Sequence, residues 1–357
     1  MTSAAFYAPM KPPDDPVPSG DRTMARALQS ALYAAGYTAE IASRFRSRDA
    51  KGCAGFQEST ILDAQIEIGK ILDKTEAKKW QFWLTYHNYY KAPDLIGPAV
   101  SQALNIPYVL AEATRARKRL NGPWDAYARA AEAATDAAST VFYFTQHDEE
   151  ALSAYAREGQ KLVHLPPFLP TATLPPASVC PPNLLSVGMF RAGDKMASYD
   201  LIIKTLMRLK HPNWHLTVVG DGPERHSVED QMAQFGERIT FTGALSGDAL
   251  HQAYQNAGIF LWPGVNEAFG MVYLEAQAAG VPVVAQNRSG VRDVLAPVTT
   301  RPSVSSGPAA LARQIDTLLA DDAARRDAGR ASRQYVEQNH LLTSAAHTLE
   351  TALKEIL

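Results

Sequence analysis

The chain alternates short runs of β-branched and aromatic residues with longer amphipathic stretches along most of its length. The strand-like runs cover 4–8, 37–43, 82–86, 108–111, 140–144, 162–164, 183–187, 215–219, 239–241, 258–261 and 282–285. Helical patterns cover 24–35, 95–104, 201–209, 249–255 and 271–279, and they fill most of 308–357. Strand and helix repeated in this way favour an α/β fold of parallel, doubly wound sheets with helices on both faces.

A proline-rich stretch at residues 165–182 interrupts this alternation. It holds seven prolines in eighteen residues. Each proline removes a backbone donor and fixes φ, so the stretch can be neither a helix nor a central strand. We therefore expect an interdomain linker here, between an N-terminal domain at 1–168 and a second domain at 169–340. We expect residues 341–357 to form a helix that packs back toward the first domain.

Composition excludes several classes of protein. The chain has 357 residues, a net charge of −2 and two cysteines, Cys53 and Cys180, which are far apart. The length suits two domains, the charge lacks the basic excess of a nucleic-acid binder, and the cysteines suggest neither a disulfide scaffold nor a zinc site. The sequence shows no leader pattern and no long apolar run, so we expect a cytoplasmic protein without a membrane span.

The densest motif lies at residues 260–284. An apolar strand is followed by a loop with Glu267, a helix opened by Gly270, and Glu275 inside that helix. Free N–H groups at a helix N-terminus hold phosphate, and carboxylates accept hydrogen bonds from sugar hydroxyls. The pattern therefore suits a nucleotide sugar. The alternative is that Glu267 only caps the helix and Glu275 is a solvated helix residue.

This block resembles the Glu-x7-Glu signature of glycosyltransferase family 4, the retaining GT-B enzymes. The match holds nearly throughout residues 260–284. The resemblance implies a GT-B fold, in which two Rossmann-like domains face a cleft. It implies that Glu267 contacts the donor sugar, that Phe269, Gly270 and Met271 hold the diphosphate through the backbone, and that Glu275 binds the ribose.

Three further segments of the second half are similar to the same family. In residues 184–195 the resemblance implies that Arg191 and Lys195 neutralise the diphosphate, although Met189 stands where the family usually has arginine. Residues 214–224 and 241–246 resemble a glycine turn at the donor site and a strand and loop beside the base. These two segments add four candidate donor-binding residues: Gly220, Asp221, Gly222 and Leu245. The alternative for Arg191 and Lys195 is that both are ordinary surface cations.

The first half carries a weaker resemblance. Residues 18–22 sit where the family has a glycine loop near the donor phosphate, which makes Gly20 a candidate; the alternative is a plain helix start capped by Ser19 or Asp21. His87 follows a strand at a position that the family often fills with a cleft-facing histidine.

Glu112 stands beside Ala113, which occupies the place of a family histidine. We expect Glu112 either to position or deprotonate the acceptor hydroxyl, or only to form an ion pair with Arg115. We take Glu267, His87 and Glu112 as the catalytic candidates.

The resemblance therefore predicts a retaining glycosyltransferase. It would move a sugar from a nucleotide diphosphate sugar to a glycan or lipid acceptor, with no metal and no separate cofactor. Family members that act on lipids dock on anionic membranes, for which residues 44–51, 74–83 and 115–119 are candidates; the alternative is that the aromatic residues of 74–83 are core. Two other functions stay open: a non-catalytic sugar-nucleotide-binding module, and another GT-B enzyme such as an epimerase or a phosphorylase.

Overall fold

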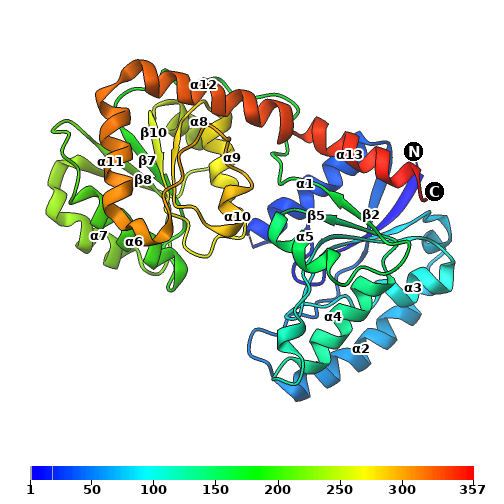
Figure 1. The fold of residues 1–357 in the computed structure, drawn as a ribbon. Coiled ribbons are helices and arrows are strands. Elements are labelled where there is room, and N and C mark those ends of the chain that lie inside the picture. The colour runs from blue at the N-terminus through cyan, green and yellow to red at the C-terminus, as the bar shows by residue number, and fades with distance from the viewer. Residues whose placement is uncertain (1, 18) are drawn as a thin grey trace. The chain divides into compact units, whose positions relative to one another are not determined.

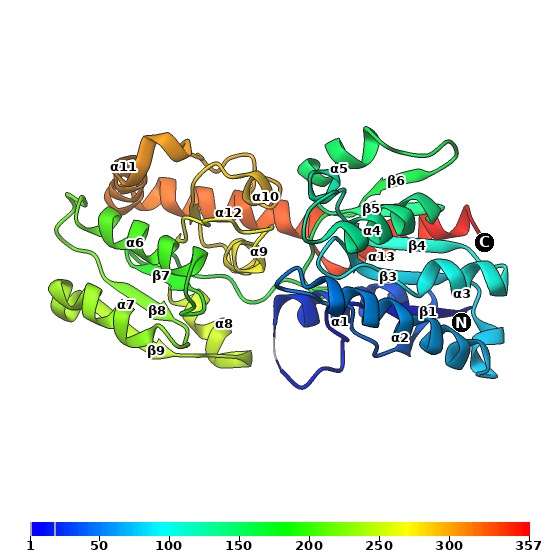
Figure 2. The same cartoon turned by 90° about the horizontal axis from the view of Figure 1, so that it is seen from below.

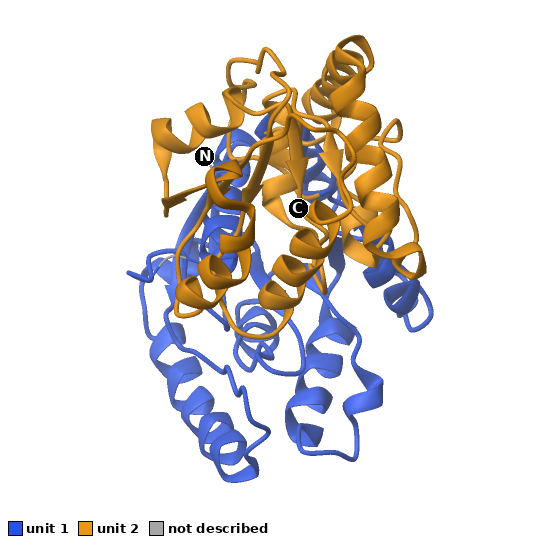
Figure 3. Ribbon diagram, turned by 90° about the vertical axis from the view of Figure 1, so that its left-hand side faces the viewer, with its two compact units in different colours: residues 1–166, 342–357 blue, residues 167–341 orange. Residues whose placement is uncertain are grey.

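The chain divides into two units, described here from a computed structural model that covers residues 2–17 and 19–357. Unit 1 comprises residues 1–166 and 342–357, and unit 2 comprises residues 167–341 (Figure 3). The chain thus leaves unit 1 after Pro166 and returns to it at Leu342. The sequence predicts these crossings after residues 168 and 340.

Unit 1 is built on a six-stranded sheet in the order β2-β1-β3-β4-β5-β6, with every neighbouring pair parallel. Figure 2 shows β5 and β6 at one end of this sheet, beside α5. The strands are β1 (Thr2–Tyr7), β2 (Tyr37–Ser43), β3 (Trp83–Asn88), β4 (Tyr108–Ala113), β5 (Thr140–Tyr143) and β6 (Lys161–His164).

Helices cover both faces of the unit 1 sheet. Helices α2, α3 and α4 pack together on one face, and α1 and α13 pack against each other on the other face (Figure 1). The buried alanines and leucines of α13 lie on the side that meets α1. The helices are α1 (Gly20–Ala34), α2 (Ala54–Leu72), α3 (Gly97–Leu104), α4 (Asp125–Ala137), α5 (Gln146–Ser153) and α13 (Leu342–Lys354), with 3-10 turns η1 (Glu76–Lys79) and η2 (Arg117–Arg119).

Unit 2 contains a five-stranded parallel sheet in the order β11-β10-β7-β8-β9. Its strands are β7 (Leu184–Val187), β8 (Leu216–Val219), β9 (Ile239–Gly243), β10 (Ile259–Leu261) and β11 (Val283–Val284). Its helices are α6 (Asp194–Leu206), α7 (Arg225–Met232), α8 (Gly247–Gln255), α9 (Met271–Ala278), α10 (Ser289–Arg292), α11 (Gly307–Ala320) and α12 (Asp322–Asn339), with η3 (Ala233–Arg238) and η4 (Val304–Ser306). The predicted α/β class with two parallel sheets is confirmed.

Each strand-like run of the sequence corresponds to a strand, but helices α2, α4, α5 and α10 do not appear among the predicted helices. Helix α2 is apolar on exposed as well as buried sides, with Leu62 and Ile66 at the surface, so its apolar residues do not form one clear stripe.

The proline-rich stretch is packed along unit 2 rather than spanning free space. The backbone N–H of Leu169 donates to His340 O at 2.8 Å, and that of Ser178 donates to Ala279 O at 2.8 Å. The buried guanidinium of Arg325 donates from Nε to Cys180 O at 3.0 Å. The prolines have no backbone N–H to donate, so the residues between them make the hydrogen bonds that fix the stretch to unit 2. Only the first two residues of 165–182 belong to unit 1.

Candidate active site

At the carboxyl ends of β7 and β8, two loops of unit 2 lie in direct backbone contact. Gly220 has φ +154°, and a Cβ atom at that position would lie 1.9 Å from Gly188 O. A Cβ at Gly222 would lie 2.2 Å from Phe190 O. The loops are also joined by a hydrogen bond of 3.0 Å from Gly188 N to Val219 O. Glycine is therefore required at 220 and 222 to bring the backbones together.

Glu267 sits at the centre of the polar contacts beside these loops. Its Oε1 atom accepts a hydrogen bond of 3.0 Å from Trp262 Nε1 and forms an ion pair with Lys195 Nζ. The same ammonium lies 5.2 Å from the centre of the Trp262 ring. Asn266 Nδ2 donates to Asp194 Oδ1 at 2.8 Å, which fastens the Glu267 loop to the start of α6. The structure thus brings two predicted donor-site residues, Lys195 and Glu267, into contact.

The loop before α9 is shaped by Gly264 and Gly270, which have φ of +73° and +72°. A Cβ on either would clash with Tyr273, whose hydroxyl donates to Trp262 O at 3.1 Å. Phe269, Gly270 and Met271 lie at the start of the eight-residue α9, whose N-cap Gly270 has no side chain to cap it. The positive end of the helix dipole therefore faces this loop.

Glu275 lies on α9 away from the Lys195 contact. Its Oε2 atom accepts a hydrogen bond of 2.7 Å from the Tyr254 hydroxyl, and both residues line a cavity of about 310 Å³ with His251 and the segment 169–175. Burial raises the pKa of Glu275, and this rise is opposed by the Tyr254 hydroxyl and the charge of His251. Glu275 is therefore half-buried and partnered, not a freely solvated helix residue.

The remaining candidates of unit 2 lie on the surrounding loops. Arg191 is exposed, and its guanidinium makes no hydrogen bond or ion pair with any residue that the structure describes. Asp221 accepts from Gly222 N at 2.7 Å and faces Arg225 at 3.4 Å. Leu245 is half-buried and packs against the core of unit 2. Direct contacts link none of these three to Glu267.

In unit 1, His87 and Glu112 end neighbouring strands and both adopt left-handed backbone conformations. Their φ values are +67° and +57°. His87 Nδ1 lies 3.4 Å from Asp21 Oδ1 and 4.0 Å from Glu112 Oε2, and neither contact has hydrogen-bond geometry. Nδ1 and Oε2 are both buried without a hydrogen-bond partner among the described residues. Such backbone strain and unsatisfied polar atoms are concentrated at functional sites.

The two residues perturb each other's protonation. Burial raises the pKa of Glu112 to about 7; the positive charge of His87 opposes this rise and the Asp148 carboxylate adds to it. Burial lowers the pKa of His87, but the carboxylates of Glu112, Asp21 and Asp148 outweigh burial, so that this pKa is raised. The cluster can therefore take up or release a proton near neutral pH.

Gly20 begins α1, and Ser19 Oγ caps this helix by accepting from Arg22 N at 3.2 Å. No atom lies within 4 Å of a Cβ built on Gly20. The neighbouring Asp21 points to His87 as described above. Pro18, the first residue of the predicted glycine loop, lies outside the described residues.

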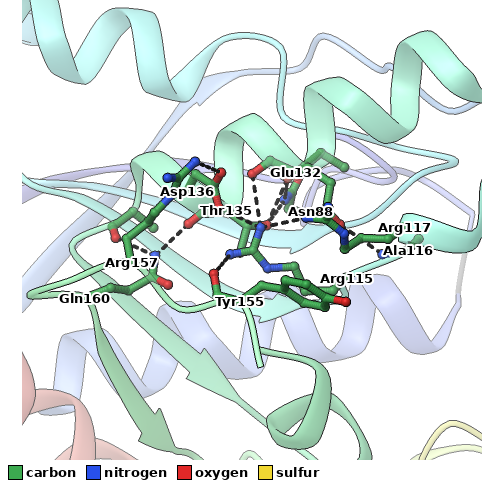
Figure 4. A network of polar contacts seen from close by, with 12 residues as sticks. Asn88, Arg115, Ala116, Arg117, Glu132, Thr135, Asp136, Tyr155, Arg157 and Gln160 are labelled. Carbon is green, nitrogen blue, oxygen red and sulfur yellow. Dashed lines mark hydrogen bonds and ion pairs between the residues drawn. The ribbon is translucent and has the colours of Figure 1, made fainter. Parts of the chain in front are cut away.

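Arg115 does not pair with Glu112. Its guanidinium contacts Glu132 Oε2 at 2.9 Å and Asp136 Oδ1 at 2.7 Å, and it donates to Tyr155 O at 2.9 Å (Figure 4). The predicted alternative, an ion pair between Glu112 and Arg115, is therefore wrong, because α4 offers Arg115 two closer carboxylates. Because Arg115 is paired with these carboxylates, the basic neighbour of Glu112 is His87.

The candidate membrane segments expose most of their cations, but the aromatic residues of 74–83 are buried. Trp80, Phe82 and Trp83 are at most 4% exposed, since they enter the core around β3. Arg44 pairs with Asp14 at 2.5 Å, and Arg115 is buried. No described helix combines the length and apolarity needed to cross a membrane.

Four residues that sequence reasoning did not select take part in these clusters. Trp262 donates a hydrogen bond to Glu267, and Tyr254 donates one to Glu275. The carboxylates of Asp21 and Asp148 raise the pKa of His87. Trp262 and Asp148 each lie within a few residues of a strand's carboxyl end, which is a usable signal. Tyr254 carries no such signal, because its contact is set by the packing of α8 on α9.

Comparison with known proteins places these clusters in a known fold. Residues 181–335 match the family described as Glycosyl transferases group 1. Sulfoquinovosyl transferase SQD2 of Arabidopsis thaliana is 31% identical over 147 residues, which are 38% of this chain and 27% of that protein. The first curated relatives are matched over only about a quarter of their length.

Solved structures resemble the chain along almost its whole length. Sucrose-phosphate synthase from Thermosynechococcus elongatus has a TM-score of 0.73 at 18% identity, covering 99% of both chains. HepE from Anabaena, solved with UDP and glucose, has a TM-score of 0.70 at 15% identity, covering 99% of this chain and 100% of that one. The chain therefore has the GT-B fold and carries, in unit 2, a domain of the glycosyl transferases group 1 family.

Proposed function

We propose that this protein is a retaining glycosyltransferase that transfers a sugar from a nucleotide diphosphate sugar to a hydroxyl group of a saccharide or lipid acceptor. The contact between Lys195 and Glu267 beside the uncapped N-terminus of α9 carries the proposal. A diphosphate needs positive charge and N–H donors, and a sugar needs a carboxylate acceptor. These groups meet within one set of loops in the domain that matches the family.

The leaving group gains negative charge as the anomeric bond breaks. Lys195 and the N–H groups at the start of α9 would stabilise that charge, because fixed donors lower the transition-state energy without reorganising. Glu267 would hold the donor sugar through its hydroxyl groups. Arg191, which has no partner in the described residues, would turn toward the diphosphate on binding.

Glu275 would bind the ribose of the nucleotide. It lines the cavity with Tyr254 and His251, and the Tyr254 hydroxyl fixes one of its oxygens. A carboxylate oriented in this way can accept from paired ribose hydroxyls.

In a retaining transfer that proceeds without a covalent enzyme intermediate, the acceptor attacks from the face that the leaving group vacates. The leaving phosphate would then take the acceptor proton. In unit 1, Glu112 would orient the acceptor hydroxyl, and its perturbed pKa allows it to share that proton.

A screen of UDP, GDP and ADP sugars by thermal shift tests the proposal, since a ligand that binds the folded state raises its melting temperature. One nucleotide series is expected to raise the melting temperature, and proton NMR of the product is expected to show the donor's anomeric configuration. The fold shared with HepE does not by itself select UDP, so all three nucleotides are needed. Absence of any shift and of any turnover would contradict the proposal.

A further inference from the structure

A row of aromatic rings leads away from His87 across unit 1. The His87 ring stacks on Tyr89 with centroids 4.6 Å apart. The centroid of Tyr89 lies 5.6 Å from that of Tyr90, and the centroid of Tyr90 lies 5.6 Å from that of Trp124; both contacts are edge to face, at 75° and 90°. Each step is comparable with the length of one sugar ring. Aromatic faces pack against the C–H faces of sugars while leaving the hydroxyl groups free to hydrogen-bond.

Two cations share the outer two rings of this row. Lys91 Nζ lies 5.7 Å from the centre of Tyr90 and 5.6 Å from that of Trp124. The Arg119 guanidinium lies 5.0 Å from the centre of Tyr90 and 6.0 Å from that of Trp124. Within the described part of the chain, neither cation forms an ion pair. Two positive charges beside the same two rings, without a counter-ion, attract an anion.

The rings are held in place before any ligand arrives. Trp124 Nε1 donates to Asp49 O at 3.3 Å. The indole also packs close to the backbone of Gly52, since a Cβ at that position would lie 3.3 Å from the ring. The Tyr89–Ala92 turn carries Tyr90 and is tied to the same loop, since Asp49 N donates to Lys91 O at 2.8 Å.

The nearby carboxylates are already occupied. Asp49 is buried and accepts from the N–H groups of Lys51, Gly52 and Cys53 at 2.8–2.9 Å. Asp125 pairs with Arg129 at 2.8 Å. Neither is therefore available to neutralise Lys91 and Arg119.

We propose that Tyr90, Lys91, Arg119 and Trp124 form the binding surface for a saccharide acceptor that carries a carboxylate or a phosphate group. The sugar would lie beside the rings of this row with its reactive hydroxyl toward His87, and its anionic group would contact the two cations. This inference rests on the proposed glycosyltransferase function and narrows the class of acceptor.

Tryptophan fluorescence can report on this surface directly. The chain has five tryptophans, and Trp80, Trp83, Trp214 and Trp262 are at most 7% exposed, whereas Trp124 is partly exposed. With each quencher calibrated on free tryptophan, iodide should quench the emission more strongly than caesium, because the cations attract an anion. Arg119→Gln should remove most of that difference. Lys118→Gln should keep it, since Lys118 is an exposed neighbouring cation without a ring contact.

Ligand binding would then be measured calorimetrically with three probes: a hyaluronan tetrasaccharide, glucose 6-phosphate and uncharged maltotetraose. We expect at least one anionic probe to bind at least ~10-fold more tightly than maltotetraose, and salt to weaken that binding. Arg119→Gln and Trp124→Leu should each weaken it ~10-fold or more, and Lys118→Gln should change it less than twofold. The source of the anion, carboxylate or phosphate, follows from which probe binds.

The inference is overturned if maltotetraose binds as well as both anionic probes, if no probe binds, or if Arg119→Gln and Lys118→Gln behave alike. Arg119-dependent binding to phosphatidylglycerol vesicles without binding of any saccharide probe would also overturn it. The nucleotide screen described above is independent of these residues. Nucleotide-sugar turnover without anionic-saccharide binding removes only this inference, and the reverse result removes the proposed function.

Discussion

Each unit places polar side chains at the carboxyl ends of the strands in its own parallel sheet. The two units differ in which residues adopt the unusual backbone conformations there. In unit 2, Asn266 and the glycines at 220, 222, 264 and 270 supply the unusual backbone, and Glu267 and Lys195 stand on ordinary conformations. In unit 1, His87 and Glu112 themselves carry the positive φ. Non-glycine residues pay a steric cost there, so the strand ends and the buried surroundings must hold them in place.

The two clusters also differ in their charged groups. The unit 2 cluster pairs a carboxylate with an ammonium and lies beside a helix N-terminus, which suits a multiply charged anion. The unit 1 cluster gathers Asp21, Glu112 and Asp148 around one imidazole, which suits the transfer or sharing of a proton. Under the proposed function, the unit 2 cluster would serve a leaving diphosphate and the unit 1 cluster an acceptor hydroxyl.

The largest expected effect breaks the unit 2 cluster. Glu267→Ala removes the carboxylate proposed to hold the donor sugar and frees Lys195, and we expect turnover to fall by about 10³-fold. Steady-state transfer assays would measure the fall. Glu229→Ala, which removes a surface carboxylate of the same unit that pairs with Arg225, is the control and should leave turnover unchanged. Full turnover by the Glu267 variant would contradict the assignment.

The second test concerns the glycine-built loops of unit 2. Gly220→Ala forces a methyl group into Gly188 O, and we expect it to cost about 3 kcal/mol of the free energy of unfolding. Gly193→Ala is the matched control, because Gly193 has a positive φ of 84° but open space around it, and it should cost about 1 kcal/mol. Urea unfolding measures both. Equal costs would mean that the loops separate easily.

The third test uses pH on the unit 1 cluster. The pKa of Glu112 is raised from 4.5 to about 7, so its contribution to stability is complete below pH 4.5 and is lost as the pH rises through 7. We expect the native protein to lose about 2–3 kcal/mol between pH 4.5 and 8 through this group. The raised pKa of His87 acts in the same direction above pH 6.5.

Glu112→Gln should therefore flatten the stability profile over this range, as measured by urea unfolding at pH 5, 6.5 and 8. Glu132→Gln, which alters a carboxylate bound to Arg115, should leave the slope unchanged although it lowers stability overall. An unaltered slope in the Glu112 variant would show that another group titrates.

The smallest effect is expected at Gly20. Since no atom lies near its Cβ position and its φ is not positive, Gly20→Ala should change stability by no more than about 0.5 kcal/mol. Thermal melting measures this change. A larger loss would show that unit 1 also depends on a close backbone approach, and the contrast between the units would weaken.

Sequence reasoning reached further in unit 2 than in unit 1. The segment 260–284 carries its chemistry in consecutive residues, so Glu267 and the start of α9 follow from local order. The contacts to Trp262 and Tyr254 depend on how the helices pack, which no local pattern records. In unit 1 the parallel strands were predictable, and His87 and Glu112 stood at their ends. Their mutual approach depends on the β3–β4 register, and the choice of Glu132 and Asp136 by Arg115 depends on where α4 packs.

The order of the units along the chain has a consequence for biosynthesis. Helix α13 packs on α1 but is translated only after all of unit 2, residues 167–341. At typical translation rates this interval lasts roughly 10–35 s, during which the apolar side of α1 that α13 later covers lacks its partner. Nascent unit 1 is therefore expected to need chaperone protection until α13 has left the ribosome. Unit 2 should finish folding before unit 1 does.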